Sequence, residues 1–369
     1  MLVCQKERVC RQNMEIDLSL PYVTHDLQGV GGQLRVSADH FLVEELLLYE
    51  PEGKGQHLYV NLTKEGLTTK EVQQKLATLF GLQTGDVGFA GLKDKHARSS
   101  QTFSLMITNV DNDLIDRAKK HIEDSLPVTV NWTRLHRNKL KPGHLLGNRF
   151  IIKITGLTLV QTEALQRARE IARRLKERGL PNFFGPQRFG FDGDNVRRGH
   201  AIILGKKDGV DRWLRYFFIS SYQSYLCNRY LIRRLELGAF DRLLTGDIAK
   251  KHATGGLFQV EDVGKEQPRY ERREISFTAP MYGTKMWAAI GPSGELETET
   301  LMKAGLTIEQ FELLGIRGTR RMGRLLVPDL TTDLDPQGLL VRFSLPKGAF
   351  ATTVLREIMK TDAQTHEIQ

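Results

Sequence analysis

The sequence predicts an α+β protein with two domains, in which short strands alternate with helices. Residues 57–62 alternate apolar and polar side chains, as a half-buried strand does. Residues 68–80 have helical periodicity, begin with the capping-box pair Thr68 and Glu71, and end before Gly81. The length of 369 residues exceeds what one hydrophobic core usually serves, so two domains are expected.

The first half of the chain contains the other elements of a sheet domain. Residues 33–46 have the pattern of a strand, a turn and a second strand, and residues 87–90 that of a short buried strand. The pattern then predicts a strand, a helix and two more strands over residues 102–107, 113–122, 128–135 and 149–154. This alternation is typical of a sheet flanked by helices.

A change in composition after Gly179 indicates a second domain. Residues 182–190 are rich in both aromatic residues and glycine, and residues 211–237 form a long, aromatic-rich helical stretch. The far edge of this region is expected at residues 315–323, where glycine recurs.

Two strand patterns after this region, at residues 324–327 and 338–344, are expected to complete the first sheet. We therefore predict a discontinuous domain of residues 1–178 and 325–369, with residues 179–324 inserted into it.

The composition is that of an ordinary soluble chain, with 40% hydrophobic and 26% charged residues. No apolar run approaches the roughly 20 residues of a transmembrane helix, and the N-terminus lacks the apolar region of a secretory signal. Cys4, Cys10 and Cys227 match neither a disulfide framework nor a zinc site. We expect a cytoplasmic protein without membrane association, with free thiols and no metal.

The net charge of +9, from 53 Lys and Arg against 44 Asp and Glu, favours a polyanionic partner such as nucleic acid. Many ordinary proteins are mildly basic, so the distribution of charge must decide. Residues 134–153 contain cations without any acid, interleaved with His136, His144 and Phe150 after Trp132, a pattern suited to phosphate contact and base stacking. The candidate RNA-binding cations of this run are Arg134, Arg137, Lys139 and Lys141.

Two further basic groups occur later in the chain. Residues 167–178 place arginines on a helix-like stretch, where Glu163, Glu170 and Glu177 equally allow an ordinary solvated face. A third group lies at residues 317–324.

Several chemistries lack their motifs. The chain has no phosphate-binding G-x-x-x-x-G-K-[ST] loop, no H-E-x-x-H and no Cys and His cluster with ligand spacing. Residues 29–32 are glycine-rich but lack the third glycine of a dinucleotide fingerprint, so we interpret them as a flexible turn.

One carboxylate has an unusual setting. Asp94 lies between Lys93 and Lys95, in a loop between two predicted strands, and a rigid layer is a common place to present catalytic groups. Nearby cations favour the ionised form, which suits a nucleophile or a general base. The alternative is a surface aspartate in a solvated turn.

Five separated segments carry a resemblance to a known family. Residues 89–97 (FAGLKDKHA), 147–150 (GNRF), 182–190 (NFFGPQRFG), 221–228 (SYQSYLCN) and 345–357 (LPKGAFATTVLRE) resemble, in order, the TruD family of tRNA pseudouridine synthases. The resemblance spans nearly the whole chain.

The resemblance implies isomerisation of uridine to pseudouridine in tRNA, at position 13 of the D arm in characterised bacterial members, by a monomer without a cofactor or metal. It implies a pseudouridine-synthase mixed sheet, an inserted α/β TRUD domain and an RNA-binding cleft between them. The family's catalytic aspartate corresponds to Asp94.

The same resemblance implies a pocket for a flipped base, because the glycosidic bond must break while the uracil is held. Phe150 matches the aromatic residue that stacks on the uracil, and Asn148 is placed to orient its polar groups. Without the resemblance, a core strand residue is the favoured interpretation of Phe150. Family members can carry an active-site lysine where this chain has Arg35, to which we assign an electrostatic role because arginine stays protonated.

Other residues of these segments are candidates for supporting roles. Phe41 and Glu45 are expected to line the pocket or to be structural, and Lys93 and Lys95 to steer phosphates unless their side chains diverge. Arg188 is expected to secure the domain junction or contact RNA. A catalytically inactive tRNA-binding module of the same fold is the alternative function, and a nuclease is disfavoured by the missing metal site.

Overall fold

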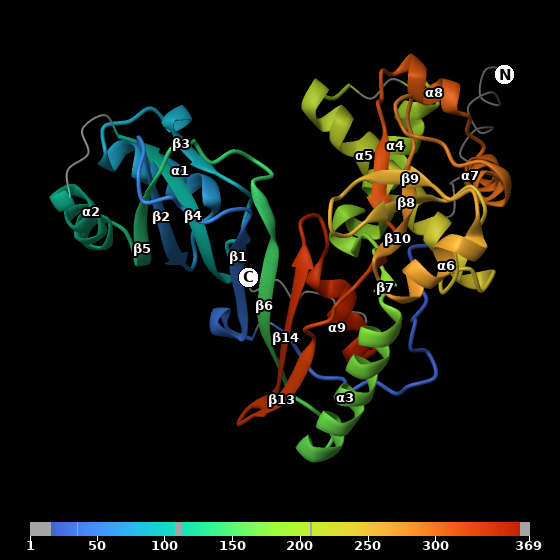
Figure 1. The fold of residues 1–369 in the computed structure, drawn as a ribbon, viewed down its shortest axis with the longest axis horizontal. Helices are drawn as coiled ribbons and strands as arrows, with labels where there is room; N and C mark the ends of the chain where they lie inside the picture. The colour runs from blue at the N-terminus through green and yellow to red at the C-terminus, as the bar shows by residue number, and fades with distance from the viewer. Residues whose placement is uncertain (1–15, 35, 108–111, 207–208, 362–369) are drawn as a thin grey trace, which may run out of the picture. The chain divides into compact units, whose positions relative to one another are not determined.

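The structure is a computed structural model that describes residues 16–34, 36–107, 112–206 and 209–361. The chain divides into two compact units (Figure 1). Unit 1 comprises Met1–Val23 and Leu180–Leu325, and unit 2 comprises Thr24–Gly179 and Leu326–Gln369. Of the described residues before Thr24, residues 16–23 belong to unit 1.

Unit 2 is built on a mixed sheet of eight strands among its described residues. The strands are β1 (Phe41–Leu47), β2 (His57–Lys64), β3 (Val87–Phe89), β4 (Arg98–Met106), β5 (Val128–His136), β6 (Leu145–Thr155), β13 (Thr331–Asp335) and β14 (Gly338–Pro346). Their order is β13-β14-β6-β1-β4-β2-β5, with β3 paired to β4. Only the β1–β4 pair is parallel in this set. The predicted α+β class with a mixed sheet is confirmed.

Helices pack on both halves of this sheet (Figure 1). They are α1 (Thr69–Leu79), α2 (Asn112–Ser125), α3 (Gln161–Arg178) and α9 (Ala351–Met359). Helix α1 contacts β3 and β4, and α2 contacts β5, whereas α3 contacts β13, β14 and α9. The predicted capping box is present, since the Thr68 side chain accepts from the Glu71 amide and the Glu71 side chain accepts from the Thr68 amide. Gly81 follows the helix at φ 64°, a left-handed conformation that glycine adopts without strain.

Strand β2 is buried on both faces, so the predicted half-buried strand is wrong in its exposure. Leu58 and Val60 belong to the core cluster that includes Val72 of α1 and Ile122 of α2. Tyr59, on the other face, is also fully buried and lies 4.9 Å from the His136 ring. The hydroxyl group of Tyr59 does not make this side chain exposed, because other residues cover this face of the sheet as well.

The predicted strand, turn and strand over residues 33–46 is only half correct. Gln33 makes a single isolated bridge to Thr155, and Ala38–His40 forms a 3-10 turn. Strand β1 then pairs with β4 and β6. The segment before β1 therefore has one bridge in place of a ladder.

Unit 1 packs helices around smaller sheets. Its strands are β7 (Leu180–Pro181), β8 (Ile248–Lys251), β9 (Leu257–Gln259), β10 (Ile275–Met281), β11 (Thr319–Met322) and β12 (Arg324–Leu325). Its helices are α4 (Asp194–Ile203), α5 (Arg212–Glu236), α6 (Val263–Glu271), α7 (Gly291–Lys303) and α8 (Ile308–Leu313). A sheet ordered β11-β10-β8-β9 supplies one side of the core, and α5 contacts β10, α4 and α7.

Of the two last predicted strands, only the second completes the first sheet. Strand β14 pairs with β6 over Gly338–Pro346, as expected. The strand predicted at 324–327 is shorter, because β12 covers Arg324–Leu325 and pairs with β7 in a separate two-stranded sheet. Leu180 and Leu325, which face each other in this pair, are both buried.

The third basic group is mostly internal to unit 1, so it is not a basic surface. Arg320 forms a buried ion pair with Glu297, with its side chain 2% exposed. The Arg321 guanidinium donates to the Asn182 side-chain oxygen at 2.6 Å. Arg324 donates to the Tyr270 carbonyl at 2.7 Å and stacks over its ring at 3.4 Å. Long arginine side chains here satisfy carbonyl groups of the interior.

The arginine-rich helix α3 agrees with the solvated-face alternative. Arg167 pairs with Glu163 at 2.6 Å. Arg173 bridges Glu170 and Glu177 at 2.6 and 2.7 Å. These are the i, i+3 and i, i+4 pairs expected on an exposed helix face.

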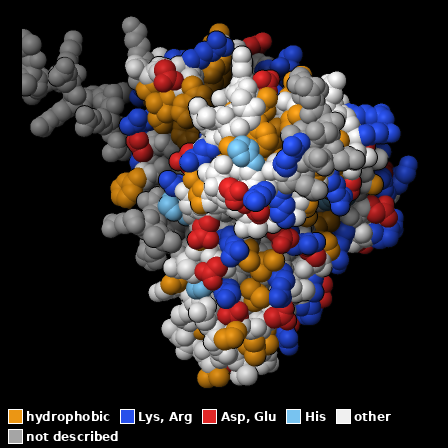
Figure 2. Space-filling view, turned by 90° about the vertical axis from the view of Figure 1, so that its left-hand side faces the viewer, with side chains coloured by type: hydrophobic (Ala, Val, Ile, Leu, Met, Phe, Trp, Pro, Cys, Tyr) orange, Lys and Arg blue, Asp and Glu red, His pale blue; other side chains and the backbone are white. Residues whose placement is uncertain are grey.

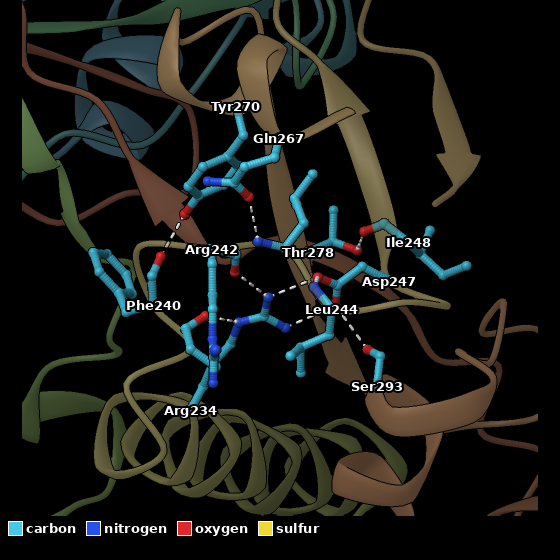
Figure 3. Close-up of polar contacts among 12 residues, drawn as sticks. Arg234, Phe240, Arg242, Leu244, Asp247, Ile248, Gln267, Tyr270, Thr278 and Ser293 are labelled. Atoms are coloured by element: carbon cyan, nitrogen blue, oxygen red, sulfur yellow. Dashed lines mark hydrogen bonds and ion pairs between the residues drawn. The ribbon is translucent and has the colours of Figure 1, made fainter. Parts of the chain in front are cut away.

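The most completely buried ion pair of unit 1 that we describe joins α5 to the segment before β8 (Figure 3). The Arg234 guanidinium meets the Asp247 carboxylate at 2.6 and 2.7 Å, and both side chains are 0% exposed. Ser293 and the Leu244 amide also donate to Asp247, each at 2.7 Å. Every polar atom of this pair that Figure 3 draws has a partner, which is the condition for holding such a pair in the interior.

No helix in the described part of the chain is both long and apolar enough to cross a membrane. Cys227 is a buried free thiol, whose pKa burial raises to about 11. Cys4 and Cys10 lie outside the described residues.

Replacing Arg234 by Met leaves the buried Asp247 carboxylate without its counter-charge. We expect the free energy of unfolding to fall by about 3–5 kcal/mol, as for other broken buried pairs. Urea unfolding followed by tryptophan fluorescence measures this. Arg173→Met on the exposed face of α3 is the control and should change the midpoint little. Equal midpoints for the two variants contradict the importance of the buried pair.

Candidate active site around the Asp94 loop

Asp94 lies in the loop that joins β3 to β4, at an exposed position. Its Oδ1 atom accepts a hydrogen bond from the His96 amide at 3.1 Å. Aspartate often forms such a turn, in which its side chain bonds the main-chain amide two residues later. The carboxylate is therefore oriented by its own loop, in a residue that is exposed.

The backbone around Asp94 is held by side chains of the sheet and of α1. Gln101 donates to the Gly91 carbonyl at 2.5 Å. The Thr69 hydroxyl accepts from the Lys93 amide and donates to Gln101, both at 2.9 Å. Thr69 and Gln101 are buried, so the base of this loop is packed and hydrogen-bonded.

Lys93 and Lys95 diverge, as the sequence left open. The Lys93 ammonium forms an ion pair with Glu45 of β1 at 2.6 Å, with side-chain exposures of 5% and 0%. The second Glu45 oxygen accepts from the Thr102 amide at 3.3 Å. Lys95 is exposed. The Lys93 ammonium is thus paired with a buried carboxylate, whereas a lysine that steers phosphates must face solvent. Lys95 does face solvent.

The pairing of β1 with β6 brings four candidate residues to one face of the sheet. Glu45 is the partner of Asn148, Val43 that of Phe150, and Phe41 that of Ile152. Because paired residues of an antiparallel ladder point to the same side, Phe41, Glu45, Asn148 and Phe150 share this face. The Lys93–Glu45 pair joins the Asp94 loop to it.

Phe150 is packed among aromatic rings. It stacks on Phe343 of β14 at 5.3 Å between centroids and meets Phe41 edge-on at 6.3 Å. Phe150 itself is 7% exposed. The ring is thus both a core residue and a member of the face that carries Asn148.

Asn148 presents an acceptor without a partner within the described structure. Its Oδ1 atom is buried and makes no hydrogen bond. A buried unpaired acceptor costs free energy unless a ligand supplies the donor. The preceding residue must be glycine, because a Cβ at Gly147 would lie 2.0 Å from the Leu345 carbonyl oxygen. The Gly-Asn sequence therefore lets β14 approach closely while Asn148 points to the shared face.

Two residues complete this inventory. Arg35 lies outside the described residues. Lys64, at the end of β2, is buried, and its ammonium donates to the Asp94 carbonyl at 3.2 Å. The sequence did not predict a role for Lys64, because a lysine at the end of the alternating pattern of residues 57–62 is expected to face solvent.

The predicted RNA-binding cations lie along and after β5, at the edge of the sheet. Arg134 and Arg137 lie 4.0 and 3.0 Å from Glu50 and Glu52. Lys139 donates to the Gly85 carbonyl, and Lys141 is exposed. The face drawn in Figure 2 has Lys and Arg side chains interspersed with Asp and Glu.

Arg188 lies in unit 1 and is half-buried. Its guanidinium donates to Ser220 and, at 3.3 Å, to Ser224 of α5, and it lies 5.4 Å from the Phe217 ring. Burial lowers the pKa of this arginine. Its orientation is therefore set by one face of α5.

No group of three or more His, Cys, Asp or Glu with the arrangement of a metal site occurs within the described ranges.

The chain matches the family model described as tRNA pseudouridine synthase D (TruD) over residues 17–210 and 207–358. It is 43% identical over 346 residues to the tRNA pseudouridine synthase D of Thermus thermophilus, covering 94% of each chain. It is 40% identical over 356 residues to that of Anaeromyxobacter dehalogenans, covering 94% of this chain and 99% of the relative.

A solved structure is also similar. The crystal structure of a Methanosarcina mazei protein, provisionally named tRNA pseudouridine synthase D, superposes with a TM-score of 0.75 at 25% identity. The alignment covers 94% of this chain and 97% of that one.

The Lys93–Glu45 pair can be tested by a double-mutant cycle. Glu45→Gln and Lys93→Met each leave one buried charge unpaired, so each should lower the free energy of unfolding by about 3–5 kcal/mol. The double variant should lose less than the sum of the two, since neither charge remains. Urea unfolding measures the three variants. Additive losses contradict direct coupling of the two side chains.

Proposed function

This chain belongs to the TruD family of tRNA pseudouridine synthases, and we propose that it isomerises uridine 13 of the tRNA D arm, with Asp94 as the catalytic carboxylate. As a member of this family it is an isomerase that acts on tRNA. The position in the D arm and the role of Asp94 are the finer parts of the proposal. The best support for Asp94 is its loop, which is packed at its base and presents Asp94 at an exposed position.

The reaction balances without a co-reactant. The bond from C1′ to N1 breaks, the uracil turns, and a bond from C1′ to C5 forms. The proton of C5 is lost to solvent and N1 gains one. Asp94 in its ionised form either attacks C1′ or removes the C2′ proton, and both routes need an oriented carboxylate. The hydrogen bond from the His96 amide supplies that orientation.

The detached uracil must be held on a surface that recognises it. We assign this to the face shared by Phe150 and Asn148. The ring of Phe150 offers stacking to the base. The unpaired Oδ1 of Asn148 suits the N3–H donor of uracil, since the nucleobase would then supply the missing hydrogen bond.

Supporting roles follow from the surroundings of each side chain. Phe41 packs against Phe150, and Glu45 forms an ion pair with Lys93. We propose that both side chains support the proposed uracil-binding face. Lys95 is exposed and is proposed to contact a phosphate. The electrostatic role proposed for Arg35 rests on the family resemblance alone.

The tRNA is proposed to contact cations of both units. Arg134, Arg137, Lys139 and Lys141 follow the edge strand β5, where the first two can exchange an acidic partner for a phosphate. Arg188 is proposed to contact RNA from the turn before α4, with its guanidinium already oriented by α5.

The domain assignment accompanies this function. We propose that residues 1–178 and 325–369 form the catalytic domain and residues 179–324 the TRUD domain. We further propose a cytoplasmic monomer that needs no cofactor.

Release of tritium from tRNA labelled at uracil C5 tests the role of Asp94. Asp94→Asn should reduce the rate by at least about 10²-fold, because a neutral amide neither attacks C1′ nor takes a proton. Asp124→Asn, at an exposed position of α2, is the matched control and should retain the wild-type rate. Full activity of Asp94→Asn sinks the assignment. A wild-type protein that binds tRNA tightly and releases no tritium is instead the inactive binding module.

Salt dependence of tRNA binding tests the basic edge. Replacing both Arg134 and Lys141 by Ala should reduce the slope of log K against log salt by about 1.5, for two lost phosphate contacts. Filter binding between 50 and 300 mM salt, roughly the range in which counterion release dominates, measures the slope. Arg173→Ala on α3 should leave it unchanged, and an unchanged slope in the double variant removes β5 from the interface.

A further inference from the structure

Lys64 is a buried lysine at the base of the catalytic loop, and no role has been assigned to it above. We propose that Lys64 is a positioning residue for Asp94, which holds the loop by its main chain and supplies a positive charge beneath the carboxylate. This inference rests on the proposed function of Asp94.

The contacts of Lys64 are made by a side chain that is 1% exposed. Its ammonium donates to the Leu67 carbonyl at 2.6 Å and to the Asp94 carbonyl at 3.2 Å. Its own backbone is fixed in the sheet, as the partner of Ser99 on β4 and Val128 on β5. Lys64 thus connects the rigid sheet directly to the residue that bears the carboxylate.

The turn that follows Lys64 reinforces the same loop. The Gly66 amide donates to the Lys95 carbonyl at 3.0 Å. Gly66 has φ 68°, a left-handed conformation that suits glycine in such a turn. Thr69, three residues on, accepts from the Lys93 amide. Three successive loop residues are therefore bound by the segment from Lys64 to Thr69.

Position matters because a single methylene group separates the carboxylate of Asp94 from this main chain. A displacement of about 1 Å at a catalytic group can cost on the order of 10²-fold in rate. The carbonyl of Asp94 and the amide of His96 flank the side chain, and each is held by a hydrogen bond. The hydrogen bond from Lys64 holds the Asp94 carbonyl, which the hydrogen bond between the Asp94 side chain and the His96 amide does not hold.

Charge is the second part of the argument. Burying an ammonium without full pairing is costly, so such lysines are rare unless they have a partner or a function. The charged groups that interact with Lys64 are Asp94 and Lys93 of the loop and Glu71 of α1. Its neighbours on β4 and β5, Ser99 and Val128, carry no charge.

Burial lowers the pKa of Lys64 to about 8, opposed by Asp94 and Glu71 and reinforced by Lys93. The ammonium is therefore present at neutral pH and lost as the pH rises through this value. The neutral amine keeps donor hydrogens but loses its charge. Activity should then decline at alkaline pH, because the positive charge that interacts with Asp94 is lost.

The test is the pH profile of tritium release by Lys64→Met, which replaces lysine by an unbranched, uncharged side chain of similar length. We expect kcat at pH 7 to fall by about 10- to 100-fold, with KM for tRNA within about twofold of the wild type. The wild-type decline near pH 8 should be absent from the variant profile. Lys75→Met, on the exposed side of α1, is the control and should retain the wild-type profile.

A Lys64→Met enzyme with the wild-type kcat and the same alkaline decline overturns the inference, whatever Asp94→Asn shows. Full activity of Asp94→Asn overturns the proposed function instead, so the two failures are distinct. Urea unfolding establishes that the variant is folded before its kinetics are compared.

If Lys64→Met does not fold, hydrogen exchange of the wild-type protein decides the question. Exchange of the Lys93 and His96 amides, corrected for the intrinsic pH dependence, should accelerate as the pH passes about 8. Protection that stays constant across this range overturns the inference.

Discussion

The buried ion pair between Lys93 and Glu45 is the contact through which the candidate active site is assembled. It joins the loop of Asp94 to strand β1, and β1 in turn sets Glu45 opposite Asn148 of β6. Such a pair is a weak source of stability, because desolvating two charges offsets most of their attraction. Its value lies in the geometry that it enforces, since an unpaired charge at either position would be strongly unfavourable. The Asp94 loop, the face that carries Asn148 and Phe150, and the sheet are thus held in one arrangement.

The positively charged side chains of this chain include three sets that the net charge does not separate. Arg320, Arg324 and Arg234 lie in the interior of unit 1, where their guanidinium groups satisfy carboxylates and carbonyls. Arg134 and Lys141 lie at the exposed edge of unit 2. Two buried lysines, Lys64 and Lys93, form a third set, at the base of the Asp94 loop. Of these three sets, only the exposed one is accessible to a polyanion in the folded protein, so the net charge overstates the accessible positive charge.

The segments that carry the family resemblance also divide between chemistry and packing. In unit 1, Phe184 and Asn228 exchange two hydrogen bonds, so residues 182–190 and 221–228 lock onto each other. In unit 2, the Asp94 carboxylate accepts a hydrogen bond from the His96 amide, and the Oδ1 atom of Asn148 has no hydrogen-bond partner among the described residues. A residue pattern shared by a family therefore marks both a fold that must be kept and a site that must stay open.

The sequence by itself determined the local features: the capping box at Thr68, the α+β class, the family and the loop position of Asp94. These depend on short-range hydrogen bonding and on periodicity, which neighbouring residues encode. Only the tertiary structure decided that Lys64 and Lys93 are buried, that β2 is covered on both faces, and that Glu45 meets Asn148. Those outcomes depend on register between strands far apart in the chain and on what covers each face, and a side chain's burial is a property of both.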